Sequence, residues 1–394
     1  MITLSHPEPM KPKHLFRLFL TCMVFASCQN NHDVSKSLPV FDLWGNKDHL
    51  IEKKMSDLVS GISYVPLEFS SEAILDIAKC LVPAGDYFII ATWKDQLSVF
   101  DRKGKFINNI GKIGKGPGEY QSIRKVFWDQ KNREVIVHNI VGAVLLFYTL
   151  DGKYLRSFKA PYLVPEIYRM QDGIYLGVTF LPVLMDSIYS RHFFFDERGM
   201  VRPVKPTSPV PFVDAVQLQE QGSHCVMGSK DLYLTARCDT VFMYDHLDLK
   251  PYCIINTGGY RAPDELYYDF DNSRLNERRQ YIIGIGIISA SNDSFTLWFG
   301  YQDERYHFIC NTTDGTTRLV QRGSSSILND LDGGHPYFFT SGYFNNTFYS
   351  VFDAFYMLTS FREGQCNNPN QQFIDMIHDL NENSNPVIVM YHLK

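Results

Sequence analysis

Apolar and polar residues alternate along most of the chain, in short runs that end at glycine, asparagine or aspartate. This period of two is typical of β-strands that bury one face, and it differs from the spacing of an amphipathic helix. Residues 86–111 predict three strands separated by turns at residues 94–95 and 101–104, and residues 134–158 repeat that order. The sequence therefore predicts a repeated unit of short antiparallel strands.

Four further copies of the unit follow, the last of them weaker than the others. They cover residues 173–204, 231–255, 294–320 and 337–361. The turn before the last strand of a unit falls at Gly104, Gly152, Gly199 and Asp248, about 48 residues apart, which is typical of β-propeller blades. The step to Gly315 is longer and contains an insertion. One small sheet cannot bury both of its faces alone, so neighbouring units must supply the missing contacts.

Six units predict an all-β fold, a six-bladed β-propeller with short helical insertions. Two β-sandwiches in series would explain the strands but not their regular spacing. Residues 62–68 and 386–393 are strand-like segments at opposite ends of the chain. We expect a terminal strand to complete a blade begun by the other end, so that no sheet edge stays open. Residues 261–282 form an insertion that favours helix, and residues 368–386 predict one short helix.

The first 27 residues have the layout of a bacterial secretory signal peptide. Basic residues precede an apolar run from Leu15 to Ala26, which is too short to cross a membrane as a helix. Residues 25–28, Phe-Ala-Ser-Cys, resemble a lipobox, and this resemblance implies that Cys28 carries a lipid anchor. The alternative is an ordinary signal peptide with a chance cysteine. We expect residues 28–45 to form a tether and residues 46–394 to form the propeller.

Composition narrows the function classes. Aromatic residues make up 14% of the chain, an excess that favours strands. The formal net charge is −5, and no basic cluster outside the signal peptide predicts a nucleic-acid surface. No two cysteines have the C-x-x-C spacing of a structural zinc site. We therefore expect most of the cysteines other than Cys22 and Cys28 to act as small apolar side chains.

Several segments together carry a family resemblance. The lipobox, the strand-like "ISYVPLE" (62–68), the loop "GKIGKGPGEY" (111–120) and the ending "NSNPVIVMYHLK" (383–394) resemble the six-bladed β-propeller lipoproteins of Bacteroidetes. Many of these are catalogued as domains of unknown function and look like relatives of the NHL-repeat and TolB-like propellers. The resemblance implies the fold and a lipid-anchored place in the cell envelope, and it implies no activity.

The glycine-rich loop 111–120 raises the question of phosphate binding. It lacks the G-K-[ST] of a phosphate loop, it leads towards a strand rather than a helix, and Pro117 removes one amide donor. We therefore predict a crossing loop between the first two blades. Its candidate binding residues are Lys112, Lys115, Glu119 and Tyr120, although Tyr120 also suits a place between blades.

A metal ion bound in the central channel is the second kind of site that we consider, because similar propeller enzymes hold a cation at the ring centre with His, Asp or Asn. The candidates here are His138, Asn139, His224, Asp303 and His307. None of them forms a tight pair such as H-x-H, so the spacing gives little support. A metal-assisted lyase or hydrolase that uses Ca²⁺ or Zn²⁺ in the central channel is therefore the alternative function.

The favoured hypothesis is a binding module without catalysis and without a cofactor. The mouth of a propeller is a concave site built from the loops of several blades. Exposed aromatic and acidic side chains at the start of the insertion and just before it would contact the ligand, and the candidates are Tyr260, Tyr267, Tyr268, Asp269 and Asp271. We expect the partner to be a protein or a carbohydrate of the cell envelope, with the membrane contacted only through the lipid.

Overall fold

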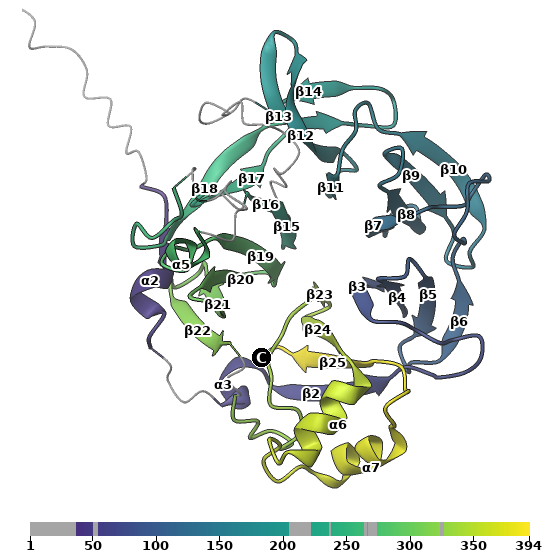
Figure 1. The fold of residues 1–394 in the computed structure, drawn as a ribbon, viewed down its shortest axis with the longest axis vertical. Helices are drawn as coiled ribbons and strands as arrows, with labels where there is room; N and C mark the ends of the chain where they lie inside the picture. The colour runs from purple at the N-terminus through teal and green to yellow at the C-terminus, as the bar shows by residue number, and fades with distance from the viewer. Residues whose placement is uncertain are drawn as a thin grey trace, which may run out of the picture. The chain divides into compact units, whose positions relative to one another are not determined.

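The computed structural model describes residues 37–49, 54–204, 222–235, 238–263, 266, 274–323 and 327–394. Between residues 38 and 394 they form six sheets arranged around a common centre (Figure 1). The predicted all-β, six-bladed propeller is confirmed. The signal peptide and Cys28 lie outside the described residues. Within the described ranges, no helix is long and apolar enough to span a membrane.

Each sheet is one blade, and the first strand of each blade lies nearest the centre of the ring (Figure 1). The first three blades are simple antiparallel meanders of consecutive strands. Blade 1 contains β3 (Ala78–Ala84), β4 (Tyr87–Thr92), β5 (Leu97–Asp101) and β6 (Phe106–Asn109); blade 2 contains β7 (Ile123–Asp129), β8 (Glu134–Asn139), β9 (Val144–Tyr148) and β10 (Tyr154–Lys159); blade 3 contains β11 (Glu166–Arg169), β12 (Tyr175–Met185), β13 (Ile188–Phe195) and β14 (Val201–Pro203).

The last three blades follow the same plan, and blade 6 also joins the two ends of the chain. Blade 4 contains β15 (Gly222–Met227), β16 (Lys230–Thr235), β17 (Thr240–Tyr244) and β18 (Leu249–Asn256); blade 5 contains β19 (Gly284–Ala290), β20 (Ser294–Tyr301), β21 (Glu304–Asn311) and β22 (Thr317–Arg322); blade 6 contains β23 (Gly342–Phe344), β24 (Thr347–Phe352), β25 (Val387–His392) and, outermost, β2 (Gly61–Pro66). Val65 of β2 lies opposite Ile388 of β25 in antiparallel register. The predicted closure by a strand from the other end of the chain is confirmed.

The segment before β2 follows the outer edge of the ring, which the sequence did not predict. β1 (Val40–Asp42) pairs in parallel with β18 and becomes a fifth strand of blade 4. The short helices α2 (Leu43–Asn46) and α3 (Met55–Leu58) follow it. Phe41 and Leu43 are fully buried against blades 4 and 5. The ordered fold therefore begins before residue 46, inside the segment expected to be a tether.

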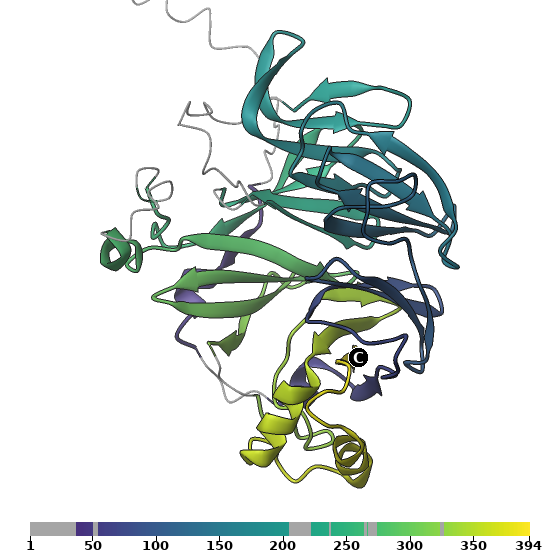
Figure 2. The same ribbon diagram turned by 45° about the vertical axis from the view of Figure 1, so that its right-hand side comes forward.

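Helices occupy two of the connections. α6 (Ala354–Arg362) follows β24, and α7 (Gln371–Asp379) precedes β25, so both project from blade 6 (Figure 2). α7 is the single helix predicted between residues 368 and 386. α6 replaces a strand that the sixth repeat had predicted there, because Asp353 caps its first turn and its buried residues Ala354, Met357 and Leu358 have helical spacing. In the insertion, the described part includes α5 (Leu275–Arg278).

The hydrophobic core is divided among the junctions between blades. Blades 1 and 2 share one cluster of buried side chains, which includes Ile89 and Val137. Another cluster unites blades 4 and 5, and each remaining junction has a cluster of its own. Since every blade buries its two faces against its neighbours, each blade depends on both neighbours for its core.

Candidate functional site

The loop 111–120 crosses from β6 to β7, as predicted, and leads into a strand rather than a helix. Tyr120 is buried, and its hydroxyl donates a hydrogen bond to the carbonyl of Ile110 at 2.9 Å. Its ring packs in the cluster shared by blades 1 and 2. Tyr120 therefore holds two blades together and is not available to a ligand.

Glu119 closes the same loop upon itself. Its carboxylate accepts a hydrogen bond from the amide of Gly116 at 2.8 Å and lies 3.0 Å from the ammonium of Lys112. The hydrogen bond from Gly116 and the contact with Lys112 lower the pKa of Glu119. Arg124, which follows this loop in β7, pairs with Glu166 of blade 3 and not with Glu119. Lys112 and Lys115 remain exposed to solvent.

Among the binding candidates from residue 260 to residue 271, Tyr260 is the one that the structure describes. Its side chain is 41% exposed, and its ring stacks on Trp44 of α2 with the ring centroids 3.8 Å apart. Tyr301 meets the edge of Trp44 at 5.1 Å. This aromatic trio fixes α2 on the junction of blades 4 and 5. The other candidates lie outside the described residues: Tyr267, Tyr268, Asp269 and Asp271.

The metal candidates do not come together. His138 and Asn139 belong to blade 2, and His224 belongs to blade 4. Nε2 of His224 lies 2.8 Å from Oδ1 of Asp231. His307 lies in blade 5, and the exposed Asp303 forms an ion pair with Arg279 at 2.6 Å. Among the described residues, no three His, Cys, Asp or Glu side chains form a group that could hold a metal ion.

Two of these histidines, His138 and His307, are buried in the core. Burial, aided by the charge of Lys125, lowers the pKa of His138 to about 4. Burial, followed by the charge of Arg305, also lowers the pKa of His307 to about 4. The ring of His307 meets that of Phe339 edge to face at 4.7 Å. Both imidazoles are therefore neutral near pH 7 and take part in the core.

The inner strands of blades 2 and 3 hold a cluster of charged side chains near the centre of the ring. Arg124 and Lys125 of β7 both pair with Glu166 of β11, and the ammonium of Lys125 lies 3.0 Å from the carboxylate. The same ammonium lies 3.5 Å from the ring centroid of Tyr168. Burial alone would raise the pKa of Glu166, but the charges of Lys125 and Arg124 outweigh it and lower the pKa. The sequence showed no sign of this cluster, because its members come from different blades.

The connections between strands define two faces of the ring. In an antiparallel meander, the turns between the first and second and between the third and fourth strands lie at one end of the blade. The second-to-third connections and the crossings to the next blade lie at the other end. We call these ends the turn face and the crossing face.

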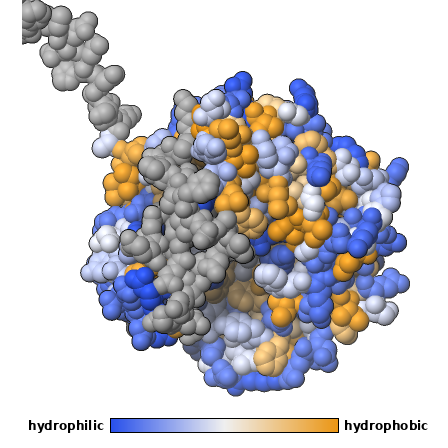
Figure 3. Space-filling model, turned by 45° about the horizontal axis from the view of Figure 1, so that its top comes forward, coloured by the Kyte–Doolittle hydropathy of each residue, from blue (hydrophilic) through white to orange (hydrophobic). Residues whose placement is uncertain are grey.

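Exposed large apolar side chains are distributed unequally between the two faces. None of the described connections of the turn face carries one, and a few lie on strands at the ring edge or centre. Most lie on the crossing face, and examples that are more than half exposed include Ile74, Ile77, Trp93, Ile113, Leu163 and Phe355. The side of the molecule seen in Figure 3 has several hydrophobic patches separated by hydrophilic residues.

A groove of about 500 Å³ lies on the crossing face at the junction of blades 6 and 1. We call it the crossing groove. Its most exposed apolar residues are Phe69, Ile74 and Ile77, which are 48%, 55% and 61% exposed. Its acidic residues are Asp76, Asp353 and Glu382.

Asn385, which the sequence did not single out, holds the two sides of the crossing groove together. Its side-chain carbonyl accepts a hydrogen bond from the amide of Leu75 at 2.8 Å. Its amide group donates to the carbonyl of Glu68 at 2.6 Å and also to that of Ala73. The groove is thus preformed, since a buried asparagine fixes the backbone of the crossing.

Comparison with known proteins places this geometry in a family. None of the curated proteins matches the chain. A solved structure of a Bacteroides fragilis protein described as exported is similar over 91% of this chain and 100% of its own, with 15% identity and a TM-score of 0.70. A member of the duf4221 family from Bacteroides vulgatus is similar over 86% and 97%, with 12% identity and a TM-score of 0.50. Residues 38–392 match the family described as Domain of unknown function (DUF4934), and the chain belongs to that family.

Proposed function

We propose that the protein is a lipid-anchored binding module of the cell envelope, which docks a partner protein on its crossing face without catalysis. The observation that carries this proposal is the unequal distribution of exposed apolar side chains. Exposed apolar groups that gather on one face are typical of protein interaction sites.

The crossing groove is the centre of the proposed contact. Ile74 and Ile77 are each more than half exposed, so covering either side chain contributes about 1 kcal/mol, by the usual energy of apolar burial. Because the groove is preformed, little ordering of the backbone opposes binding. Aliphatic side chains offer no hydrogen bonds to sugar hydroxyls, which favours a protein partner over a carbohydrate at this site.

The charges around the groove define the chemistry of the partner. Asp76 lies 3.4 Å from Lys94, and Glu382 lies 2.9 Å from Arg362. Asp353 forms no ion pair with a described residue, although it caps α6. A partner segment with an apolar side chain beside a lysine or arginine would fit this groove.

The envelope location rests on the signal-like leader, on the lipobox-like residues around Cys28 and on the similarity to an exported Bacteroides protein. A lipid anchor would keep the module at a membrane surface, where a partner protein of the same envelope is concentrated. This arrangement requires no channel metal.

Photo-crosslinking in intact cells tests the proposal. A photoreactive phenylalanine analogue is placed at Ile77, on the crossing face, or at Ile107, an equally apolar exposed position on the outer strand of the same blade. We expect discrete crosslinked products from position 77 and none from position 107. Charge reversal in the groove by Asp353→Lys should reduce the yield at position 77.

Products of equal yield from both positions, or from neither, would contradict the docking face. Calcium or zinc bound in stoichiometric amount to purified, tag-free protein would instead favour the alternative, a metal-assisted lyase or hydrolase.

A further inference from the structure

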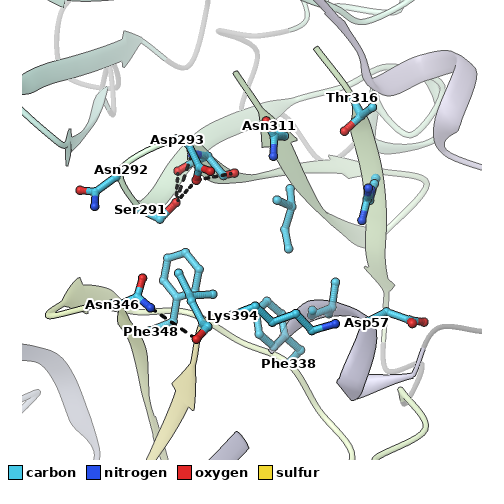
Figure 4. A pocket seen from close by; sticks show the side chains of 15 residues that line it. Asp57, Ser291, Asn292, Asp293, Asn311, Thr316, Phe338, Asn346, Phe348 and Lys394 are labelled. Carbon is cyan, nitrogen blue, oxygen red and sulfur yellow. Dashed lines mark hydrogen bonds between the residues drawn. The ribbon is translucent and has the colours of Figure 1, made fainter. Parts of the chain in front are cut away.

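A second hollow lies on the turn face, at the junction of blades 5 and 6. It has a volume of about 360 Å³, and we call it the turn pocket. Three turns converge on it: residues 291–293 between β19 and β20, residues 312–316 between β21 and β22, and the tip of the β23–β24 hairpin at Asn346. Figure 4 shows Ser291, Asn292 and Asp293 across an open space from Phe348 and Lys394.

The walls of the turn pocket are fixed by hydrogen bonds that leave other polar atoms available. The side-chain carbonyl of Asn311 accepts from the amides of Thr313 and Asp314 at 2.8 and 3.2 Å, so its own amide group stays a donor. One carboxylate oxygen of Asp293 accepts from Ser291 at 2.9 Å. Two rigid turns therefore present one donor group and one carboxylate to the same hollow.

Arg318 and Asn292 supply further hydrogen-bonding groups to the turn pocket. Both side chains are exposed, both line the turn pocket, and neither forms a hydrogen bond or ion pair with a described residue. A guanidinium and an amide can each bind two oxygens of one ligand at once, because their hydrogen-bonding atoms form planar forks. Both side chains are therefore free to form hydrogen bonds with a ligand in this hollow.

The balance of charges and the apolar floor define the ligand. The acidic side chains of Asp57 and Asp293 balance the basic side chains of Arg318 and Lys394 around the pocket, so the lining side chains favour neither an anion nor a cation. Ile309, Leu58 and Phe348 provide apolar surface below the polar rim. A neutral ligand with hydroxyl groups on its edge and C–H groups on its face matches both features.

We propose that the turn pocket binds a neutral sugar unit. Each hydroxyl of a sugar donates and accepts, which suits a rim of carboxylate, amide and guanidinium groups. The volume lies at the lower end of the range for small-molecule sites, so the pocket has room for one or two sugar rings. This site is on the face opposite the crossing groove and does not depend on the proposed function.

The test measures binding of glucose, galactose, mannose, xylose, N-acetylglucosamine, maltose and cellobiose to the purified full chain by calorimetry and ligand-observed NMR. We expect at least one of them to bind, and Arg318→Ala to weaken its binding about tenfold, since a hydrogen bond to a charged group is lost. Asn311→Ala should have a similar effect. Arg318→Lys, which keeps the charge but loses the planar fork, should not restore binding.

Blade 3 provides matched controls. Arg202 is the second residue of its outer strand β14, as Arg318 is in β22. Asp196 accepts from the amides of Arg198 and Met200, which is the role of Asn311 in blade 5. Arg202→Ala and Asp196→Ala should leave sugar binding unchanged. Absence of binding by every sugar, or binding that survives both pocket substitutions, would overturn the proposal, and so would equal losses in the blade 3 controls.

Discussion

The hydroxyl of Ser63 lies 2.8 Å from Nε2 of His392, although 329 residues separate them in the sequence. This contact lies within the pairing of β2 with β25, where the N-terminal strand becomes the outer strand of the last blade. Nδ1 of the same histidine lies 3.3 Å from the hydroxyl of Thr347 in β24. His392 therefore ties three strands of blade 6, and the ring is closed by residues from both ends of the chain.

Ring closure predicts that β2 is indispensable. A variant that begins at residue 67 lacks β2, exposes the edge of β25 and opens the cluster around Val65 and Ile388. We expect it to aggregate or to lose cooperative unfolding, because an unpaired strand edge is exposed. A variant that begins at residue 54 lacks β1 and α2 but keeps β2, and it should still unfold cooperatively at a lower temperature. Circular dichroism during heating separates the two outcomes.

Equivalent turn glycines in two blades should differ in their tolerance of alanine. Gly104 and Gly199 have nearly equal positive φ angles of 84° and 89°. A Cβ atom at Gly104 would lie 2.1 Å from the carbonyl oxygen of Pro66, whereas one at Gly199 would meet no atom within 4 Å.

Gly199→Ala should therefore cost about 1 kcal/mol of stability, the usual penalty of a left-handed residue with a side chain. Gly104→Ala should cost clearly more, because the backbone of the closing strand must also move. Urea unfolding of both variants measures the difference, and equal losses would show that the contact with Pro66 is easily relieved.

The charge cluster near the ring centre should be sensitive to loss of its carboxylate. Glu166→Gln leaves Arg124 and Lys125 without their common partner, and we expect a loss of about 3 kcal/mol because two cations stay close together in a buried place. Glu197→Gln removes a more exposed carboxylate, which lies 3.1 Å from Arg156, and should cost less than about 1 kcal/mol. Denaturant unfolding at pH 7 compares them. A small loss for both would mean that water screens the cluster at the centre.

Buried histidines predict a loss of stability in mild acid. Burial lowers the pKa of His335 to about 3, from an ordinary value of 6.5, and its ring lies against Phe352 with the centroids 4.0 Å apart. Between pH 6.5 and 4 the unfolded chain binds a proton that the folded ring does not, so stability falls as the pH falls. Above pH 6.5 both states are neutral, and this effect vanishes.

The substitution His335→Phe removes the imidazole that binds this proton in the unfolded chain. Between pH 6.5 and 4 the variant should lose less stability than the natural protein, by up to about 3 kcal/mol. The measurement is the free energy of unfolding in urea at several pH values. Parallel curves for the two proteins would mean that His335 does not contribute.

The lipid anchor predicts a change of compartment when its cysteine is replaced. Cys28→Ala should move the protein from the membrane fraction to the soluble fraction after cell lysis, because a thioether-linked lipid can no longer form. Metabolic labelling with a fatty-acid analogue should mark the natural protein and not the variant. Retention of the variant in membranes would contradict the anchor.

The candidate site could be predicted only in part. Tyr120 was correctly assigned a second role between blades, since it ends the loop 111–120, whose length and glycines identify a crossing. The metal candidates lie in three different blades, so they do not meet. The spacing of these residues along the chain does not show which side chains the ring brings together. Asn385 and Arg318 carry no local motif, so nothing in the sequence distinguishes them from other surface residues.

The sequence by itself determined the number of blades, the outer turns and the closing strand. Alternation, turn chemistry at residues such as Gly104 and the repeat length are local properties, and each blade repeats them. The tertiary structure decided what the blades bring together: Glu166 with Arg124, Phe41 with the junction of blades 4 and 5, and the two polar turns of the turn pocket. These contacts depend on the twist and packing of neighbouring sheets, which no single stretch of sequence encodes.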